Sequence, residues 1–186
     1  MAKATRLRKP QIAHLLRAVA GVTGHASFVM IGTGAVIARS KVLALDLMRT
    51  RDIDVYAADT PDAERLSDLI DGSIGEGSPF DETFGYYAHG VSAATACLPD
   101  DWAERATRLA IPGGAACLCP EENDIGLAKL CAWRQKDQDW LAAGLRTGLL
   151  DIAAMEARST AISNSNAPAP AEIGRRLLQL RQLAGP

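Results

Sequence analysis

The sequence predicts an α+β protein with a mixed, largely antiparallel central sheet, flanking helices and a helical C-terminal part. Two observations indicate the elements. Short apolar runs bounded by Gly, Pro and polar residues indicate strands, and segments with apolar residues every three or four positions indicate helices. A third observation sets the class, because the strands and helices do not alternate regularly. Regular alternation would favour a doubly wound or barrel fold, so we expect α+β.

The N-terminal half predicts helices around two short strands. Apolar spacing over residues 10–20 indicates a helix, and the apolar run at 27–31 indicates a buried strand. Residues 32–34 (Gly-Thr-Gly) interrupt this strand, and 35–47 have helical character. Residues 51–57 predict the second strand. The pattern Thr-Pro-Asp-Ala-Glu at 60–64 is typical of a helix start, with a capping hydroxyl followed by Pro and acidic residues.

From residue 72 onward, the sequence predicts a loop at 72–79 and β-like structure over 83–98. Strands at 106–111 and 115–118 flank Pro-Gly-Gly, which indicates a hairpin. Further helices are expected from residue 120, over 135–147 and over 151–158. We expect a domain over 1–158, a flexible Ser/Asn/Ala/Pro-rich linker over 159–170 and a tail helix over 171–186.

Composition and charge exclude some broad classes. The 186 residues carry a formal net charge of −2, which gives no global electrostatic reason to bind nucleic acid or a membrane. No apolar stretch approaches the roughly 20 residues of a membrane span, and the first apolar run does not fit a secretory signal. We therefore expect a cytoplasmic protein without a membrane partner. The four cysteines are interpreted as buried reduced thiols.

The residues most indicative of chemistry are Asp52 and Asp54. In a strand they share one face, while Ile53 and Val55 point into the core. Two adjacent carboxylates repel each other, and a divalent cation such as Mg²⁺ relieves that repulsion. A solvated strand edge is the simpler interpretation of such a pair taken alone.

The Gly-Thr-Gly turn before this strand adds a second indication. Backbone N–H groups at a helix start can bind phosphate oxygens, and Thr33 adds a hydroxyl beside Gly32. Arg49 or Arg51 would neutralise remaining charge. The turn matches neither a P-loop nor a dinucleotide fingerprint, and an ordinary tight turn is the alternative. Together, the turn and the acidic strand suit phosphoryl or nucleotidyl transfer.

The segments 32–33 (GT) and 49–54 (RTRDID), with a helix between them, resemble the polymerase-β-type nucleotidyltransferase superfamily. Three further segments follow in the chain: 98–105 (LPDDWAER), 117–125 (CLCPEENDI) and 129–137 (KLCAWRQKD). With these segments, the chain is similar, more narrowly, to minimal nucleotidyltransferases grouped with the AbiEii-type toxins and with the domain of unknown function 6036. The resemblance extends over roughly residues 10–157.

This resemblance implies a nucleotidyltransferase-like fold and a set of site residues. Gly32 and Thr33 match the nucleotide-phosphate turn, Asp52 and Asp54 match the metal-binding carboxylates, and Lys129 matches a phosphate-contacting lysine. Asp137 matches a later aspartate of the toxin motif, although pairing with Arg134 to fix a helix is the alternative from spacing. The implied reaction is Mg²⁺-dependent transfer of a nucleoside monophosphate from an NTP. The acceptor would be RNA such as tRNA, a protein or a small molecule.

The chain also departs from the superfamily pattern. The third strand of the superfamily often carries another carboxylate, and residues 86–91 (YYAHGV) contain none. His89 lies in this segment, and only a close approach to the Asp pair would make it a catalytic base. Two functions therefore follow from the sequence: a nucleotidyltransferase, as the toxin partner of a cognate antitoxin, or a non-catalytic nucleotide-binding or partner-docking module. No motif identifies the NTP, the acceptor or the oligomeric state.

Overall fold

The computed structural model describes residues 6–40 and 50–185. The chain forms two compact units, each described by itself below. Unit 1 consists of Met1–Ala93 and Ala106–Cys119, and unit 2 consists of Ala94–Arg105 and Pro120–Pro186. The chain changes unit at three points, after Ala93, after Arg105 and after Cys119.

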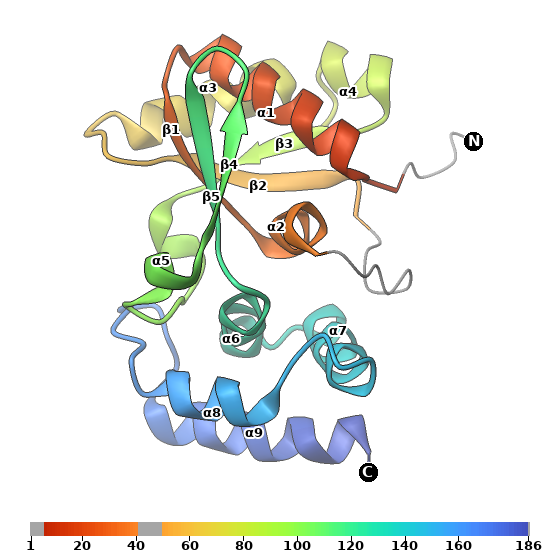
Figure 1. Cartoon of the computed structure of the whole chain (residues 1–186), viewed down its shortest axis with the longest axis vertical. Coiled ribbons are helices and arrows are strands. Elements are labelled where there is room, and N and C mark those ends of the chain that lie inside the picture. The colour runs from red at the N-terminus through yellow and green to blue at the C-terminus, as the bar shows by residue number, and fades with distance from the viewer. Residues whose placement is uncertain (1–5, 41–49, 186) are drawn as a thin grey trace. The chain divides into compact units, whose positions relative to one another are not determined.

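Unit 1 is a five-stranded sheet with helices packed on it (Figure 1). The strand order is β3-β2-β1-β5-β4. The helices of this unit are α1 (Lys9–Thr23), α2 (Gly32–Arg39), α3 (Ala63–Ile74) and α4 (Pro79–Phe84). The strands are β1 (Ser27–Ile31), β2 (Asp52–Ala57), β3 (Tyr87–Gly90), β4 (Thr107–Ile111) and β5 (Ala115–Cys119).

The mixed α+β sheet is confirmed, but antiparallel pairing is not dominant. Strand β1 is antiparallel to β2 and β4 is antiparallel to β5, whereas β1–β5 and β2–β3 are parallel. The expected excess of antiparallel pairs was wrong because α3 and α4 lie between β2 and β3. A helical crossover returns the chain to the same end of the sheet, so the next strand runs parallel.

Residues 79–98 differ most from the sequence prediction. The segment expected to be β-like from residue 83 begins inside α4, and β3 is only four residues long. The Ser78 hydroxyl accepts a hydrogen bond from the Asp81 N–H, and Pro79 occupies the first turn of α4. These helix-start signals fall at the end of the loop expected at 72–79, and the aromatic residues that follow them favour a strand by composition alone. A short 3-10 helix, Ala93–Thr95, follows β3.

Unit 2 is helical. It contains α5 (Trp102–Arg105), α6 (Glu122–Ala132), α7 (Gln135–Arg146), α8 (Ile152–Ser159) and α9 (Pro170–Ala184). The expected tail helix is present as α9, which packs against α7 and α8 (Figure 1). Its apolar side is buried through Ile173, Leu177 and Leu180. An amphipathic helix with such a stripe gains its stability mainly from packing, which explains why α9 belongs to this unit.

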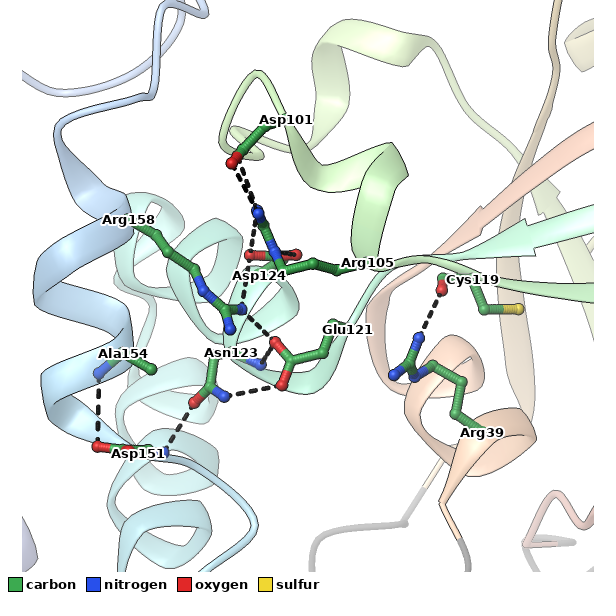
Figure 2. A network of polar contacts seen from close by, with 10 residues as sticks. All are labelled: Arg39, Asp101, Arg105, Cys119, Glu121, Asn123, Asp124, Asp151, Ala154 and Arg158. Carbon is green, nitrogen blue, oxygen red and sulfur yellow. Dashed lines mark hydrogen bonds and ion pairs between the residues drawn. The ribbon is translucent and has the colours of Figure 1, made fainter.

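A polar network joins three segments of unit 2 (Figure 2). The Asp124 carboxylate is fully buried and accepts hydrogen bonds from Arg105 Nε at 3.0 Å and Arg158 Nη1 at 3.0 Å. Arg105 also donates to Asp101, at 2.7 Å from Nη1, and Arg158 contacts Glu121. The resembling segments 98–105 and 117–125 therefore meet through charge-assisted hydrogen bonds.

The irregular segment between α8 and α9 is held to the rest of unit 2. The Ser163 hydroxyl donates to Asp100 Oδ1 at 2.7 Å, and Asn164 Nδ2 donates to the Ala96 carbonyl at 3.3 Å. The Asp100 N–H donates to the Ala161 carbonyl at 2.8 Å. The Asn164 side chain thus satisfies a backbone carbonyl and the Ser163 hydroxyl satisfies the Asp100 carboxylate, as turn-forming residues often do.

Two global expectations can be compared with this fold. All four cysteines, at 97, 117, 119 and 131, are buried free thiols, as the sequence analysis predicted. Within residues 6–40 and 50–185, no helix combines the length and apolar character needed to cross a bilayer.

Candidate functional site

The turn between β1 and α2 lies directly against the acidic strand. Gly32 begins α2 with φ +69°, a left-handed conformation that glycine adopts readily. A Cβ atom at this position would lie 2.7 Å from Asp54 Oδ2. The structure therefore brings the glycine turn close to the second aspartate, and a side chain at position 32 would require Asp54 to shift.

Replacing Gly32 with alanine is expected to destabilise unit 1 by about 1–3 kcal/mol, because the left-handed backbone becomes strained and the new methyl group displaces Asp54. Urea unfolding followed by far-UV circular dichroism measures this loss. Gly24→Ala is the matched control, since Gly24 has φ +63° but open space at its Cβ position. If both variants lose the same stability, the contact with Asp54 contributes nothing.

The two aspartates of β2 lie on one face of the strand, as the sequence predicts. Asp52 and Asp54 are partly exposed, and the alternating Ile53 and Val55 are fully buried. Helix α2 packs on the apolar face, because a Cβ atom at Gly34 would lie 2.9 Å from Ile53 Cγ2. The core thus fixes the strand and directs both carboxylates to the other face.

The residues just before β2 are engaged in local contacts. The Thr50 hydroxyl donates to the Asp52 carboxylate. Arg51 Nη2 donates to the buried Asp81 carboxylate at 2.7 Å, and its guanidinium lies 5.0 Å from the centroid of the Tyr87 ring. Arg51 therefore links the residue before β2 to Asp81 and to Tyr87 of β3 in this structure. The predicted phosphate contact Arg49 lies outside the described residues.

Strand β3 places two further side chains beside the aspartates. Tyr87 is in register with Asp52, and His89 is in register with Asp54. Burial, together with the nearby Asp52 carboxylate, raises the pKa of Tyr87 to about 12. His89 is exposed. The sequence alone does not place His89 beside Asp54, because strand register depends on contacts between distant segments.

In unit 2 the structure brings Lys129 and Asp137 together. Lys129 Nζ lies 3.4 Å from Asp137 Oδ1 and 5.0 Å from the centroid of the Trp140 ring. The lysine side chain is largely buried, and desolvation lowers its pKa while Asp137 opposes that shift. Lys129 is therefore a largely buried, paired lysine and not a solvated surface residue.

Asp137 also has the structural role that the sequence left open. Its fully buried carboxylate accepts a hydrogen bond from Arg134 Nε at 2.6 Å and one from the Arg134 N–H at 3.3 Å. These contacts form a capping box at the start of α7. One carboxylate thus orders a helix terminus and neutralises Lys129.

The predicted site residues therefore form two local sets. Gly32, Asp52 and Asp54 belong to unit 1, where Thr33 is the second residue of α2, and Lys129 and Asp137 belong to unit 2. The part of the chain that the structure describes contains no group of three or more His, Cys, Asp or Glu side chains placed to hold a metal ion. The Asp pair of unit 1 still suits Mg²⁺, which commonly takes one or two carboxylates and completes its shell with water and phosphate oxygens.

Comparison with curated proteins and with solved structures found no match. A family model described as a nucleotidyltransferase of unknown function (DUF6036) matches residues 10–180. This range includes the glycine turn, both aspartates of β2, Lys129 and Asp137, and it extends into α9. The chain therefore belongs to the DUF6036 family of nucleotidyltransferases of unknown function.

Proposed function

We propose that this protein transfers a nucleoside monophosphate from an NTP to an acceptor hydroxyl in a Mg²⁺-dependent reaction. The observation that carries the proposal is the 2.7 Å separation between Asp54 Oδ2 and the Cβ position of Gly32. A phosphate bound at the start of α2 would lie next to a cation bound by Asp54. This proximity supports transfer, because positioning and charge neutralisation supply most of the catalysis in such reactions.

The proposed roles follow from the chemistry of each side chain. Asp52 and Asp54 would hold Mg²⁺, which supplies positive charge against the phosphates. Gly32 and Thr33 would bind phosphate oxygens through backbone N–H groups and the threonine hydroxyl. The acceptor hydroxyl releases its proton to solvent and its oxygen forms a bond to the α-phosphorus, while the bond from that phosphorus to the β-phosphate oxygen breaks. Pyrophosphate is the leaving group.

Three residues outside the Asp pair also have roles in the proposal, Lys129 and Asp137 through the family resemblance and Arg49 through its positive charge. Lys129 and Arg49 would contact the triphosphate, and Asp137 would hold the Lys129 ammonium group through the pairing seen at 3.4 Å. Resemblance to AbiEii-type toxins extends the proposal to a toxin whose acceptor is tRNA, another RNA, a protein or a small molecule. A cognate antitoxin would then be its partner.

A second candidate is a nucleotide-binding or partner-docking module without catalysis. Two observations favour it: the described strand β3 carries no carboxylate, and Lys129 already pairs with Asp137. Such a module would bind Mg²⁺ and NTP without releasing pyrophosphate.

Position-specific labelling tests the proposal. The purified chain is incubated with Mg²⁺ and the four NTPs, labelled either at the α- or at the γ-phosphate, and with total RNA, total cell protein or an aminoglycoside. We expect α-label in an acceptor, γ-label in pyrophosphate, and loss of both reactions with EDTA or in the Asp52→Asn/Asp54→Asn double variant. Transfer of γ-label to the acceptor, or equal labelling by both proteins, would contradict nucleotidyl transfer. Calorimetric Mg·NTP binding without any transfer would identify the module instead.

A further inference from the structure

The exposed imidazole of His89 lies on the strand next to Asp52 and Asp54, on the face of the sheet that carries these two carboxylates (the acidic face). Strand β3 is an edge strand, and its parallel pairing with β2 places His89 in register with Asp54. Neighbouring strands lie about 4.8 Å apart, so these two residues are direct cross-strand neighbours. The glycine turn lies against the same aspartate, at 2.7 Å from Oδ2 to the Gly32 Cβ position.

Strand alternation shows that His89 and the aspartates share one face of the sheet. Residues in register on paired strands point to the same side, so Asp54 and His89 lie on one face and Val55 and Gly90 lie on the other. Helix α3 packs on the second face, because a Cβ atom at Gly90 would lie 2.1 Å from the Ser67 carbonyl oxygen. His89 is therefore directed away from the packed helices and toward the acidic face.

The imidazole stands beside ordered neighbours. The rings of Tyr87 and His89 have centroids 5.8 Å apart at an interplanar angle of 62°. The Arg51 guanidinium lies over the Tyr87 ring at 5.0 Å, and Arg51 is held in turn by the buried Asp81. Aromatic edge contacts and cation–π contacts of this kind restrict ring orientation. His89 thus combines solvent access with a defined position.

The other described side chains next to Asp52 and Asp54 do not combine solvent access with a free polar group. On the β1 side, Asp54 is in register with the buried, apolar Ile31. Beside Asp52, the Tyr87 side chain is buried, and the Thr50 hydroxyl already donates to Asp52. Among the described cross-strand neighbours of the aspartates, His89 is the exposed polar side chain.

From this register we infer that His89 binds the attacking hydroxyl of the acceptor through a hydrogen bond from or to a ring nitrogen. The inference rests on the proposed function and adds the acceptor side of the site. The NTP phosphates lie against Gly32 on one side of Asp54, and the acceptor hydroxyl approaches over His89 on the other. Holding the two reactants on opposite sides of one metal-binding carboxylate aligns them for attack.

Steady-state kinetics of His89 variants tests this role with the acceptor identified by the labelling assay. We expect His89→Ala to lower kcat/KM for the acceptor by about 10- to 100-fold. The dissociation constant of Mg·NTP, measured by calorimetry, should stay within about twofold, because His89 does not contact the nucleotide in this arrangement. His89→Gln, which keeps a hydrogen-bonding group at a similar reach, should recover most of the lost kcat/KM.

Arg108→Ala is the matched control, because Arg108 is an exposed residue of β4, the other edge strand. Unchanged kcat/KM in His89→Ala would overturn the inference, as would a parallel loss of Mg·NTP affinity or an equal effect of Arg108→Ala. The proposed function fails separately, and the inference with it, if the wild-type protein labels none of the three acceptor preparations.

Discussion

Asp54→Asn is expected to lower the rate of nucleotidyl transfer by about 10³-fold, equivalent to about 4 kcal/mol of transition-state stabilisation. Asparagine keeps the shape of the aspartate, so it fits against Gly32, where a Cβ atom would lie 2.7 Å from Oδ2. It lacks the negative charge that holds a hard cation. The expected loss is therefore chemical, with little change in the free energy of unfolding.

Initial rates of α-label transfer at increasing Mg²⁺ concentration provide the measurement. Asp59→Asn is the matched control, since Asp59 follows the far end of β2, is exposed and hydrogen-bonds Ser27 at 3.1 Å. Its φ of 57° is a conformation that asparagine also tolerates. Asp59→Asn should transfer at the wild-type rate. An Asp54→Asn rate within about fivefold of wild type would remove Asp54 from the proposed metal site.

Asp124→Ala is expected to destabilise unit 2 by about 3–5 kcal/mol. The carboxylate of Asp124 has no solvent exposure, and it neutralises Arg105 and Arg158, whose side chains are each 23% exposed. Without it, each guanidinium group keeps only its other partner, Asp101 for Arg105 and Glu121 for Arg158, and loses its fully buried counter-charge. Breaking a buried ion pair by removing one partner costs more than the pair contributes, because a desolvated charge is left unpaired.

Tryptophan fluorescence during urea unfolding measures this loss selectively. All three tryptophans, Trp102, Trp133 and Trp140, belong to unit 2, so the signal reports on this unit. Asp101→Ala is the control, because Asp101 also pairs with Arg105 but its side chain is 48% exposed. Its loss of stability should be far smaller, as is usual for exposed ion pairs. Equal midpoints for the two variants would show that burial adds nothing to the Asp124 network.

Local patterns predicted many elements of this fold because their signals lie within one segment. The hairpin formed by β4 and β5 follows from Pro-Gly-Gly between two apolar runs, and α7 follows from its helical spacing. The alternation at Asp52–Val55 predicted which side chains of β2 face the core, and the burial of Ile53 and Val55 agrees. Errors arose where signals overlapped, as at α4, where a capped helix start precedes a run of aromatic residues.

The polar contacts of unit 2 were only partly accessible from local sequence. The sequence offered Asp137 either as a site residue or as a partner of Arg134, and the structure shows the pairing with Arg134 together with the contact to Lys129. The Asp124 network was not anticipated. Its members come from α5, α6 and α8, and nothing in their spacing indicates that their side chains meet in a buried position.

By itself, the sequence determined that β2 presents two carboxylates on one face and that a glycine turn ends the preceding strand. It also carried the motifs by which the chain resembles its nucleotidyltransferase family, because motif order and strand periodicity are properties of the linear chain. Only the tertiary structure decided that Gly32 touches Asp54 and that His89 stands beside the same aspartate. Both contacts are set by strand register, which arises from packing and backbone hydrogen bonds between segments far apart in the chain.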